Sequence, residues 1–590
     1  MTRWGIVMCA CAAAFGAGCK KKADAPASAA SAPANVASAA DAQLTTLGDR
    51  FFDEVYLPFA PSEATGFGFH AYDGRLEDLS ATAVRAQVQR LERFRTELAA
   101  VNRSALSKAA RIDAELLLSN VDAQLFALTK VRAWARDPDV YTSLASRAVF
   151  VIMSRAFAPA EARLRSVIAR EEQMPRLFEA ARANLPAARP PRIFCEIAAS
   201  QLPGIVRFFE KDVPAAFTQV RDEALLAHFR KANTAVIAML RAHQKWLAAE
   251  LMPKCDGDFR LGAALYAEKL RLDEMVTLPL DKLRAVGLAD LRRNQARLKA
   301  VAAKLDPKKT VEQINAEVTL HHPPPDKLLQ TFRDQLGGLR AFIEEKKLAT
   351  FPSKVPPRLE ETPPFARALT FASMDTPGPY ETKATEAFFN VTLPEPTWSK
   401  AAVAEHMGGF NHGMILSTAI HEAYPGHYLQ FLWVQRAPSK IRKLLGAGSN
   451  AEGWAHYTEE MMFDEGYGGG DPRLRFGQLL DALLRNARFV VGIAMHTGEM
   501  TFEQGVEFFV KEGFQTRANA LRETKRGTSD PTYLVYTLGK LQILKLREDY
   551  KRMKGAAFTL GDFHDRFLAE GYPPIKLVRR ALLGEDGETL

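Results

Sequence analysis

Apolar residues recur at helical spacing along most of this 590-residue chain. Between residues 84 and 98, five of them are separated by four, three, three and four positions: Val84, Val88, Leu91, Phe94 and Leu98. This spacing places all five on one face of a helix. The same pattern predicts longer helices at 224–251, 281–305 and 327–347. We therefore expect a mainly α-helical fold, with charged outer faces and apolar inner faces.

The residue pattern of the sequence changes after residue 351. Prolines cluster between residues 352 and 364, which is typical of a boundary or a loop. Two short runs, Ala368–Met374 and Phe388–Leu393, then predict strands on either side of a Pro/Gly turn region. Beyond Pro396 the helical pattern resumes. We divide the folded body into a helical scaffold region at 46–360 and a second region at 361–590.

The N-terminus is typical of an export signal. Arg3 precedes a short run of apolar and small residues that ends in Gly16-Ala17-Gly18-Cys19. Residues 1–18 fit a cleaved signal peptide, and the small residues before Cys19 resemble the bacterial lipobox, whose cysteine is acylated. The Ala/Ser/Pro-rich sequence that follows predicts a lipidated flexible tether at 19–45. The alternative is an ordinary secreted protein with an unmodified cysteine.

These features predict an exported protein that a lipid anchors in the bacterial envelope, at its periplasmic face or outer membrane. The chain offers no later window of about 18 apolar residues, so lipid would be the only membrane attachment. A net charge of +9 is mild over this length, and no basic stripe follows Lys20-Lys21-Lys22. We therefore expect no nucleic-acid partner. Cys195 and Cys255 could form one disulfide or remain two buried thiols.

Half of the twelve histidines lie between residues 406 and 496: His406, His412, His421, His427, His456 and His496. The centre of this region reads HEAYPGH, from His421 to His427. On a regular helix, a spacing of six residues would leave the two end histidines roughly 120° apart. Pro425 cannot donate a backbone hydrogen bond, and Gly426 permits dihedral angles that other residues avoid. We expect the helix to break after Tyr424 and to bring His427 back toward His421.

Two histidines and a carboxylate can hold a catalytic zinc ion and leave one coordination position open. We predict one Zn²⁺ per chain, bound by His421, His427 and Glu452, with Glu422 as the general base; manganese or cobalt could occupy the same ligands. Gly453 would allow another segment to approach Glu452 closely. His456, one turn further on, is either an outer partner of the ligands or itself a ligand. Glu459 and Glu460 are expected to be solvated or to be outer partners.

HEAYPGH followed by EGWAHY resembles the bacterial domain-of-unknown-function family 885, whose members carry an HExxPGH signature and resemble gluzincin-type zinc peptidases. The resemblance covers nearly the whole chain after the tether. Further stretches share it: Pro61–Gly66, Arg485 and Arg488, Gly492–Thr497, Asp530–Tyr536, Gly539 and Leu546-Arg547.

The resemblance implies a multi-helical metallopeptidase architecture with a cleft and a small β element beside the active-site helix. Phe388–Leu393 would be an edge strand that holds the substrate backbone, with Asn390 a backbone contact. Tyr536 or His496, with Tyr533 behind them, would stabilise the oxyanion. Arg485 and Arg488 would bind a substrate carboxylate, or else satisfy helix ends or glutamate ligands.

The favoured hypothesis is a zinc-dependent hydrolase that cleaves peptide bonds, mainly in short peptides. Metal-activated water would attack the peptide carbonyl, and Glu422 would take up its proton. A second hypothesis is that the protein is a metal-dependent amidase that acts on cell-envelope peptides. A third reading is a lipid-anchored binding protein with a structural metal, in which His456 closes a four-ligand site.

Overall fold

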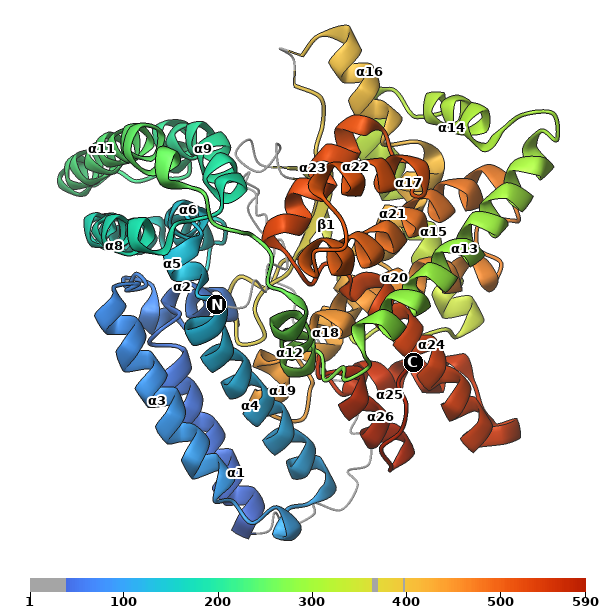
Figure 1. The fold of residues 1–590 in the computed structure, drawn as a ribbon, viewed down its shortest axis with the longest axis horizontal. Coiled ribbons are helices and arrows are strands. Elements are labelled where there is room, and N and C mark those ends of the chain that lie inside the picture. The colour runs from blue at the N-terminus through green and yellow to red at the C-terminus, as the bar shows by residue number, and fades with distance from the viewer. Residues whose placement is uncertain (1–38, 363–369, 396–397) are drawn as a thin grey trace, which may run out of the picture.

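The structure is a computed structural model that describes residues 39–362, 370–395 and 398–590. It is mainly helical, with one small sheet (Figure 1). The N-terminal helices, which lie on the left in Figure 1, are α1 (Ala39–Arg50), α2 (Pro61–Phe67), α3 (Ala81–Ala99), α4 (Lys108–Phe126), α5 (Ala133–Arg136), α6 (Asp139–Met153), α7 (Ala160–Glu171), α8 (Met174–Ala188), α9 (Arg192–Arg207), α10 (Val213–Ala215) and α11 (Glu223–Trp246).

Four helices lead into the second half: α12 (Ala263–Asp273), α13 (Leu280–Leu305), α14 (Val311–Leu320) and α15 (Leu328–Lys346). The remaining helices are α16 (Lys400–Gly408), α17 (His412–Glu422), α18 (His427–Val434), α19 (Lys440–Leu444), α20 (Gly448–Asp464), α21 (Pro472–His496), α22 (Phe502–Lys511), α23 (Arg517–Ser529), α24 (Val535–Lys554), α25 (Leu560–Ala569) and α26 (Ile575–Leu583).

The predicted long helices are confirmed as α11, α13 and α15. The run at residues 84–98 is also helical, within α3, and its leucines and Phe94 are buried. Ser80 begins this helix because its side chain accepts a hydrogen bond from the Ala83 N–H, which satisfies one of the free donors of the first turn. Helix α1 begins at Ala39, inside the segment expected to be a tether, because Leu44 and Leu47 pack into the N-terminal core.

Two apolar cores stabilise the N-terminal half. One lies among α6–α9 and α11 and includes Cys195 and Cys255, which form a disulfide. The alternative of two free thiols is therefore wrong. The other core joins α1, α3 and α4 to α19 and α26, so the end of the chain packs against its beginning.

The sheet has three strands: β1 (Arg358–Glu361), β2 (Ala372–Asp375) and β3 (Phe388–Val391). Their order is β1-β3-β2, with β1 parallel and β2 antiparallel to β3. The expectation that Phe388–Leu393 is an edge strand is therefore wrong, because both sides of β3 are hydrogen-bonded. Asn390 lies in the middle of this strand and is fully buried. The edge strand beside α17 is β2.

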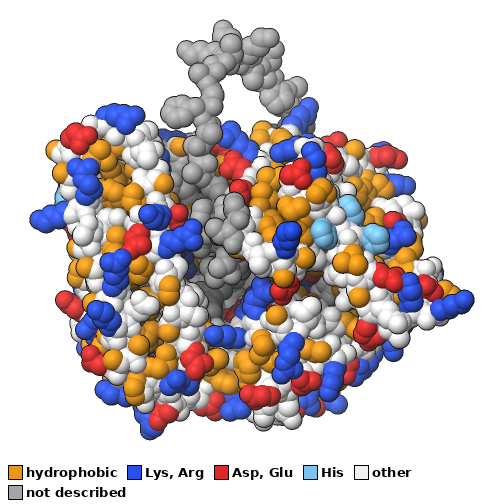
Figure 2. Space-filling model, turned by 90° about the horizontal axis from the view of Figure 1, so that it is seen from above, with side chains coloured by type: hydrophobic (Ala, Val, Ile, Leu, Met, Phe, Trp, Pro, Cys, Tyr) orange, Lys and Arg blue, Asp and Glu red, His pale blue; other side chains and the backbone are white. Residues whose placement is uncertain are grey.

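The expected boundary between residues 360 and 361 falls inside β1. The core beneath α17 takes residues from both sides of it, among them Phe332 of α15 and Phe389 of β3. On the face seen in Figure 2, basic and acidic side chains are interspersed. Within the described ranges, no helix is both long enough and apolar enough to cross a membrane.

Candidate metal centre

The helical conformation is interrupted between the two histidines of HEAYPGH. Helix α17 ends at Glu422 and α18 begins at His427, so the helix is interrupted, as predicted, although it ends two residues earlier than expected. A Cβ atom on Gly426 would lie 1.9 Å from the carbonyl oxygen of His421, so this close approach requires glycine. The ring centroids of His421 and His427 are 4.7 Å apart.

Helix α20 supplies the carboxylate. Glu452 Oε2 lies 3.5 Å from His421 Nε2 and 3.4 Å from His427 Nε2. One ligand atom from each of these three residues lies within 4.8 Å of the others. The tertiary structure thus brings together all three predicted metal ligands.

The electrostatics of the three side chains fit a cation. Burial opposes the charge on His421, but Glu452 and Glu459 outweigh it and raise the pKa of His421 to about 9. Burial likewise opposes ionisation of Glu452, yet His421 and His427 hold the pKa of this carboxyl well below its usual range. The contacts from Glu452 to the two rings exceed the usual length of a charge-assisted hydrogen bond. Two imidazoles and one carboxylate form a donor set that suits zinc.

Glu422 lies beside this group. Its Oε2 accepts a hydrogen bond of 2.9 Å from the backbone N–H of Met374 in β2. Burial raises the pKa of Glu422, and the charge of Glu452 raises it further, while His421 and His427 act in the opposite direction. A carboxylate with a raised pKa can both accept and return a proton near neutral pH.

Tyr536 reaches the centre from α24. Its ring stacks on that of His421, with centroids 6.3 Å apart. A Cβ atom on Gly453 would lie 2.4 Å from the Cα of Gly539, so α20 and α24 cross in close contact. The expectation that Gly453 permits a close approach is confirmed, and this crossing carries Tyr536 toward Glu452.

A second layer of buried polar groups supports the ligands. The carboxylate of Glu459 is fully buried and bridges His421 Nδ1 (2.7 Å) and His456 Nδ1 (3.0 Å). His456 is thus an outer partner, connected to His421 only through Glu459. The sequence contained a signal for this role, since Glu452, His456 and Glu459 follow i, i+4, i+7 spacing on one helix face.

Other predicted residues lie elsewhere or are already paired. His496 is not brought to the ligands: its Nε2 lies 2.8 Å from the Gly527 carbonyl, and its Nδ1 lies 3.4 Å from the Leu261 N–H. Both of its ring nitrogens are therefore used in packing the end of α21. An oxyanion role for His496 does not fit this placement.

Arg485 and Arg488 form ion pairs with buried carboxylates near the centre. Arg485 contacts Glu459 at 3.0 Å and Asp481 at 2.9 Å. Arg488 binds both oxygens of Glu523, at 2.7 and 2.9 Å. Their partners are neither helix ends nor the ligand Glu452, which were the predicted alternatives, but other carboxylates. Because their charges are already matched, binding of a substrate carboxylate does not fit this placement. Asn390 is enclosed in β3, and Cys19 lies outside the described residues.

The fold and the site define a mainly helical protein with a buried group of two histidines and a carboxylate, and a further glutamate beside them. The chain belongs to the family described as "Bacterial protein of unknown function (DUF885)", whose model matches residues 61–582.

Two solved structures share the fold over 92% of this chain and 99% of their own, each with a TM-score of 0.76. One is described as "a putative lipoprotein of unknown function" from Shewanella oneidensis and is 28% identical. The other is a "putative lipoprotein" from Colwellia psychrerythraea and is 17% identical. No curated protein matches the chain.

Proposed function

We propose that this protein is a zinc-dependent hydrolase that cleaves peptide bonds, mainly in short peptides. The observation that carries the proposal is the convergence of His421, His427 and Glu452, with the Glu422 carboxylate beside them. A purely structural metal site has no need of an additional, uncoordinated carboxylate such as Glu422, whose pKa is raised.

His421, His427 and Glu452 would hold the ion. Bound zinc supplies a Lewis acid for a peptide carbonyl and lowers the pKa of water. Glu422, held in place by the Met374 N–H, takes the proton from the attacking water and then gives it to the leaving amine.

Tyr536 is the group best placed to stabilise the oxyanion. Burial raises the pKa of Tyr536, and the nearby Glu452 raises it further, whereas Arg526 and Arg488 lower it. The phenol therefore remains protonated at neutral pH and can donate a hydrogen bond.

Strand β2 supports the proposal from the substrate side. It is the edge strand beside α17, and its Met374 N–H donates to Glu422 rather than to β3. A peptide backbone aligned along this edge would pass the general base.

An envelope location follows from two observations. The sequence offers a signal peptide and Cys19 as a lipidation site. The two structures of the same fold carry lipoprotein in their names. We propose that the protein is exported and held at a bacterial membrane by lipid.

Metal analysis combined with peptide hydrolysis tests the function. We expect one zinc per chain in both wild type and Glu422→Gln, and a loss of hydrolysis of about 10²- to 10⁴-fold in the variant. Glu405→Gln, on the exposed face of α16, is the matched control and should retain full activity. Protein that holds no divalent metal, or hydrolysis that survives chelation, would refute the proposal. Zinc without hydrolysis of any peptide, cell-wall stem peptides included, would indicate a structural metal.

A further inference from the structure

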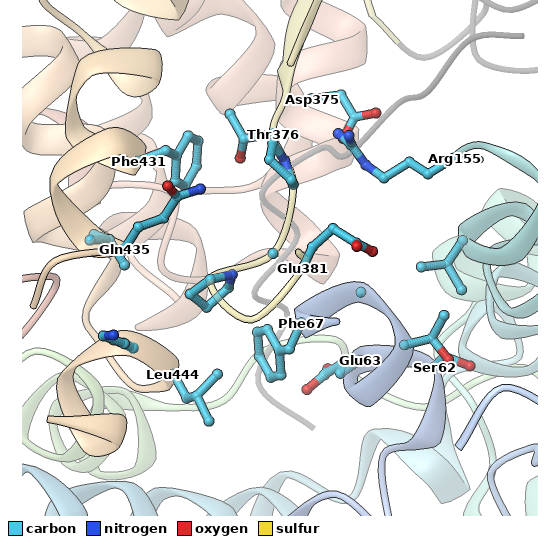
Figure 3. A pocket seen from close by; sticks show the side chains of 18 of the residues that line it. Ser62, Glu63, Phe67, Arg155, Asp375, Thr376, Glu381, Phe431, Gln435 and Leu444 are labelled. Carbon is cyan, nitrogen blue, oxygen red and sulfur yellow. The ribbon is translucent and has the colours of Figure 1, made fainter. Parts of the chain in front are cut away.

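A cavity of about 350 Å³ lies between the N-terminal and C-terminal halves (Figure 3). Segments far apart in the sequence line it: α2, α6, the loop after β2, and the stretch from α18 to α19. In Figure 3, Phe431 and Leu444 lie on the left, Phe67 and Glu63 of α2 lie low in the centre, and the loop after Thr376 passes between Phe431 and Phe67.

The cavity borders the candidate metal centre. Phe431 lines it, and the Phe431 ring centroid is 6.1 Å from that of His427. Asp375 also lines it and directly follows Met374, whose N–H binds Glu422. Tyr572 also lines the cavity, and its ring centroid lies 5.7 Å from that of Phe431. Phe431 and the end of β2 therefore connect the cavity wall to His427 and to Glu422.

Most of the cavity wall is apolar. The wall residues come from both halves of the molecule, and the larger ones are Phe67, Phe150, Phe157, Phe431, Val434 and Leu444. A wall of this kind favours a large apolar side chain, since removing apolar surface from water is favourable.

Three carboxylates and three cations line the cavity, but not all of them form ion pairs. The three carboxylates already have partners: Glu63 binds the Tyr56 hydroxyl (2.7 Å), Asp375 binds Arg155 (2.6 Å) and Glu381 binds His70 (2.9 Å). Arg147 and Lys443 also line the cavity. Within residues 39–362, 370–395 and 398–590, neither cation has a carboxylate partner among the ion pairs found. Lys443 lies over the Tyr380 ring, 5.6 Å from its centroid. Arg147 and Lys443 are therefore two cations without a carboxylate partner of their own in the described part of the chain, and they suit an anionic ligand group.

Part of the cavity wall comes from Pro61–Gly66, one of the stretches that resemble the family. Ser62, Glu63 and Thr65 all line the cavity. A Cβ atom on Gly378 would lie 2.1 Å from the carbonyl oxygen of Gly66, and the Tyr380 N–H donates to the Phe67 carbonyl at 3.0 Å. The end of α2 and the loop after β2 are therefore in direct backbone contact at this side of the cavity.

We propose that the cavity is the subsite for the C-terminal residue of a peptide substrate, with a large apolar side chain and a free α-carboxylate. The proposal rests on the proposed function, because the cavity acquires this role from its place beside the metal centre. The apolar wall takes the side chain, and Arg147 and Lys443 bind the carboxylate. Hydrolysis adds the water oxygen to the preceding carbonyl carbon and breaks the C–N bond, and the leaving amine receives the proton from Glu422.

Calorimetry on Glu422→Gln tests the subsite without requiring turnover. The probes are N-acetyl-Gly-Gly-Phe, its C-terminal amide, and the free acids ending in Ala and Asp. We expect the Phe acid to bind about tenfold or more tightly than the amide and than the Ala and Asp peptides. Equal affinity for acid and amide, or a preference for Asp, would overturn the proposal.

Substitutions of residues that line the cavity test which groups bind the side chain and the carboxylate. Val151→Phe fills part of the cavity and should weaken the Phe peptide about tenfold while leaving the Ala peptide unchanged. Ser154→Phe serves the same purpose if the first variant folds poorly. Arg147→Met with Lys443→Met should make acid and amide bind equally, whereas Arg85→Met, on the exposed side of α3, should preserve the difference. If Val151→Phe and Ser154→Phe weaken the binding of all the peptides equally, the cavity does not bind the C-terminal side chain, and the proposal is contradicted.

Wild-type hydrolysis of the same four peptides separates the two proposals. Hydrolysis without any preference among them would refute the subsite and leave the proposed function intact. The predicted binding preference in Glu422→Gln, without hydrolysis by the wild type, would refute the function and leave the binding site intact.

Discussion

Glu459 Oε1 lies 2.7 Å from His421 Nδ1, on the side of the imidazole ring away from Glu452. Burial alone would favour a neutral carboxyl, but Arg485, His456 and His421 hold the pKa of Glu459 far below its usual range. An ionised carboxylate can only accept hydrogen bonds, so His421 Nδ1 carries a proton and Nε2 is the nitrogen that faces Glu452. Glu459 therefore fixes both the ring orientation and the tautomer of a metal ligand.

Replacement of Glu459 should consequently weaken metal binding. We expect Glu459→Gln to bind zinc about 10- to 100-fold less tightly than the wild type, because an amide supports the imidazole less strongly. Competition with a chelator of known affinity measures this directly. Glu405→Gln is the control, and an unchanged zinc affinity in Glu459→Gln would contradict the supporting role.

Gly426 is the second test of the centre. An alanine Cβ there would lie 1.9 Å from the His421 carbonyl oxygen, so the backbone between α17 and α18 would have to change its conformation. We expect Gly426→Ala to lose about 1–3 kcal/mol of unfolding free energy and much of its zinc affinity. Gly204→Ala in α9 is the matched control, since no described atom lies within 4 Å of a Cβ built there. A Gly426→Ala protein with normal zinc affinity would show that this backbone conformation is not required for metal binding.

Glu274 makes the unfolding free energy depend on pH. Its buried carboxylate accepts hydrogen bonds from the N–H groups of Gly448 and Ser449 at the start of α20. Burial raises the pKa of Glu274 to about 7, although the Ser449 hydrogen bonds lower it. The ordinary pKa is 4.5, so the folded protein holds this proton more tightly than the unfolded chain. The contribution of Glu274 to stability is therefore full below about pH 4.5 and declines as the pH rises to about 7.

The matching variant is Glu274→Gln. The unfolding free energy of the wild type minus that of the variant should fall by roughly 3 kcal/mol between these two pH values, at about 1.4 kcal/mol per pH unit. Denaturant unfolding at several pH values measures this difference. A difference that stays constant with pH would show that folding leaves the pKa of Glu274 unchanged, and one that grows would show that folding lowers it; either result would contradict the prediction.

The disulfide should stabilise the N-terminal half specifically. Cys195 and Cys255 are 60 residues apart in the sequence and are buried in the core of α6–α9 and α11. Closing a loop of this length is worth about 4 kcal/mol in the chain-entropy model. We expect Cys195→Ala with Cys255→Ala to lower the unfolding temperature and to leave zinc affinity unchanged. Added reductant should lower the unfolding temperature of the wild type but not that of the double variant.

Helical periodicity was sufficient to predict α3, α11, α13 and α15, because their buried stripes follow from local spacing alone. It was not sufficient for the sheet. Strand β1 lies in a proline-rich segment with no alternating pattern, and the central place of β3 depends on pairing with strands on both sides. Strand order is a long-range property, so a single run such as Phe388–Val391 looks the same at an edge and in the centre.

The same division applies to the site. The sequence alone determined the candidate ligands, the adjacent Glu422 and the interruption at Pro425-Gly426, because residue type and local backbone constraints specify them. Only the tertiary structure decided that His496 faces Gly527, that Arg485 is matched by Glu459 and Asp481, and that Pro61–Gly66 lines a cavity beside the centre. These outcomes depend on how helices far apart in the sequence pack together, and packing distributes charge partners and cavities in ways that no local pattern encodes.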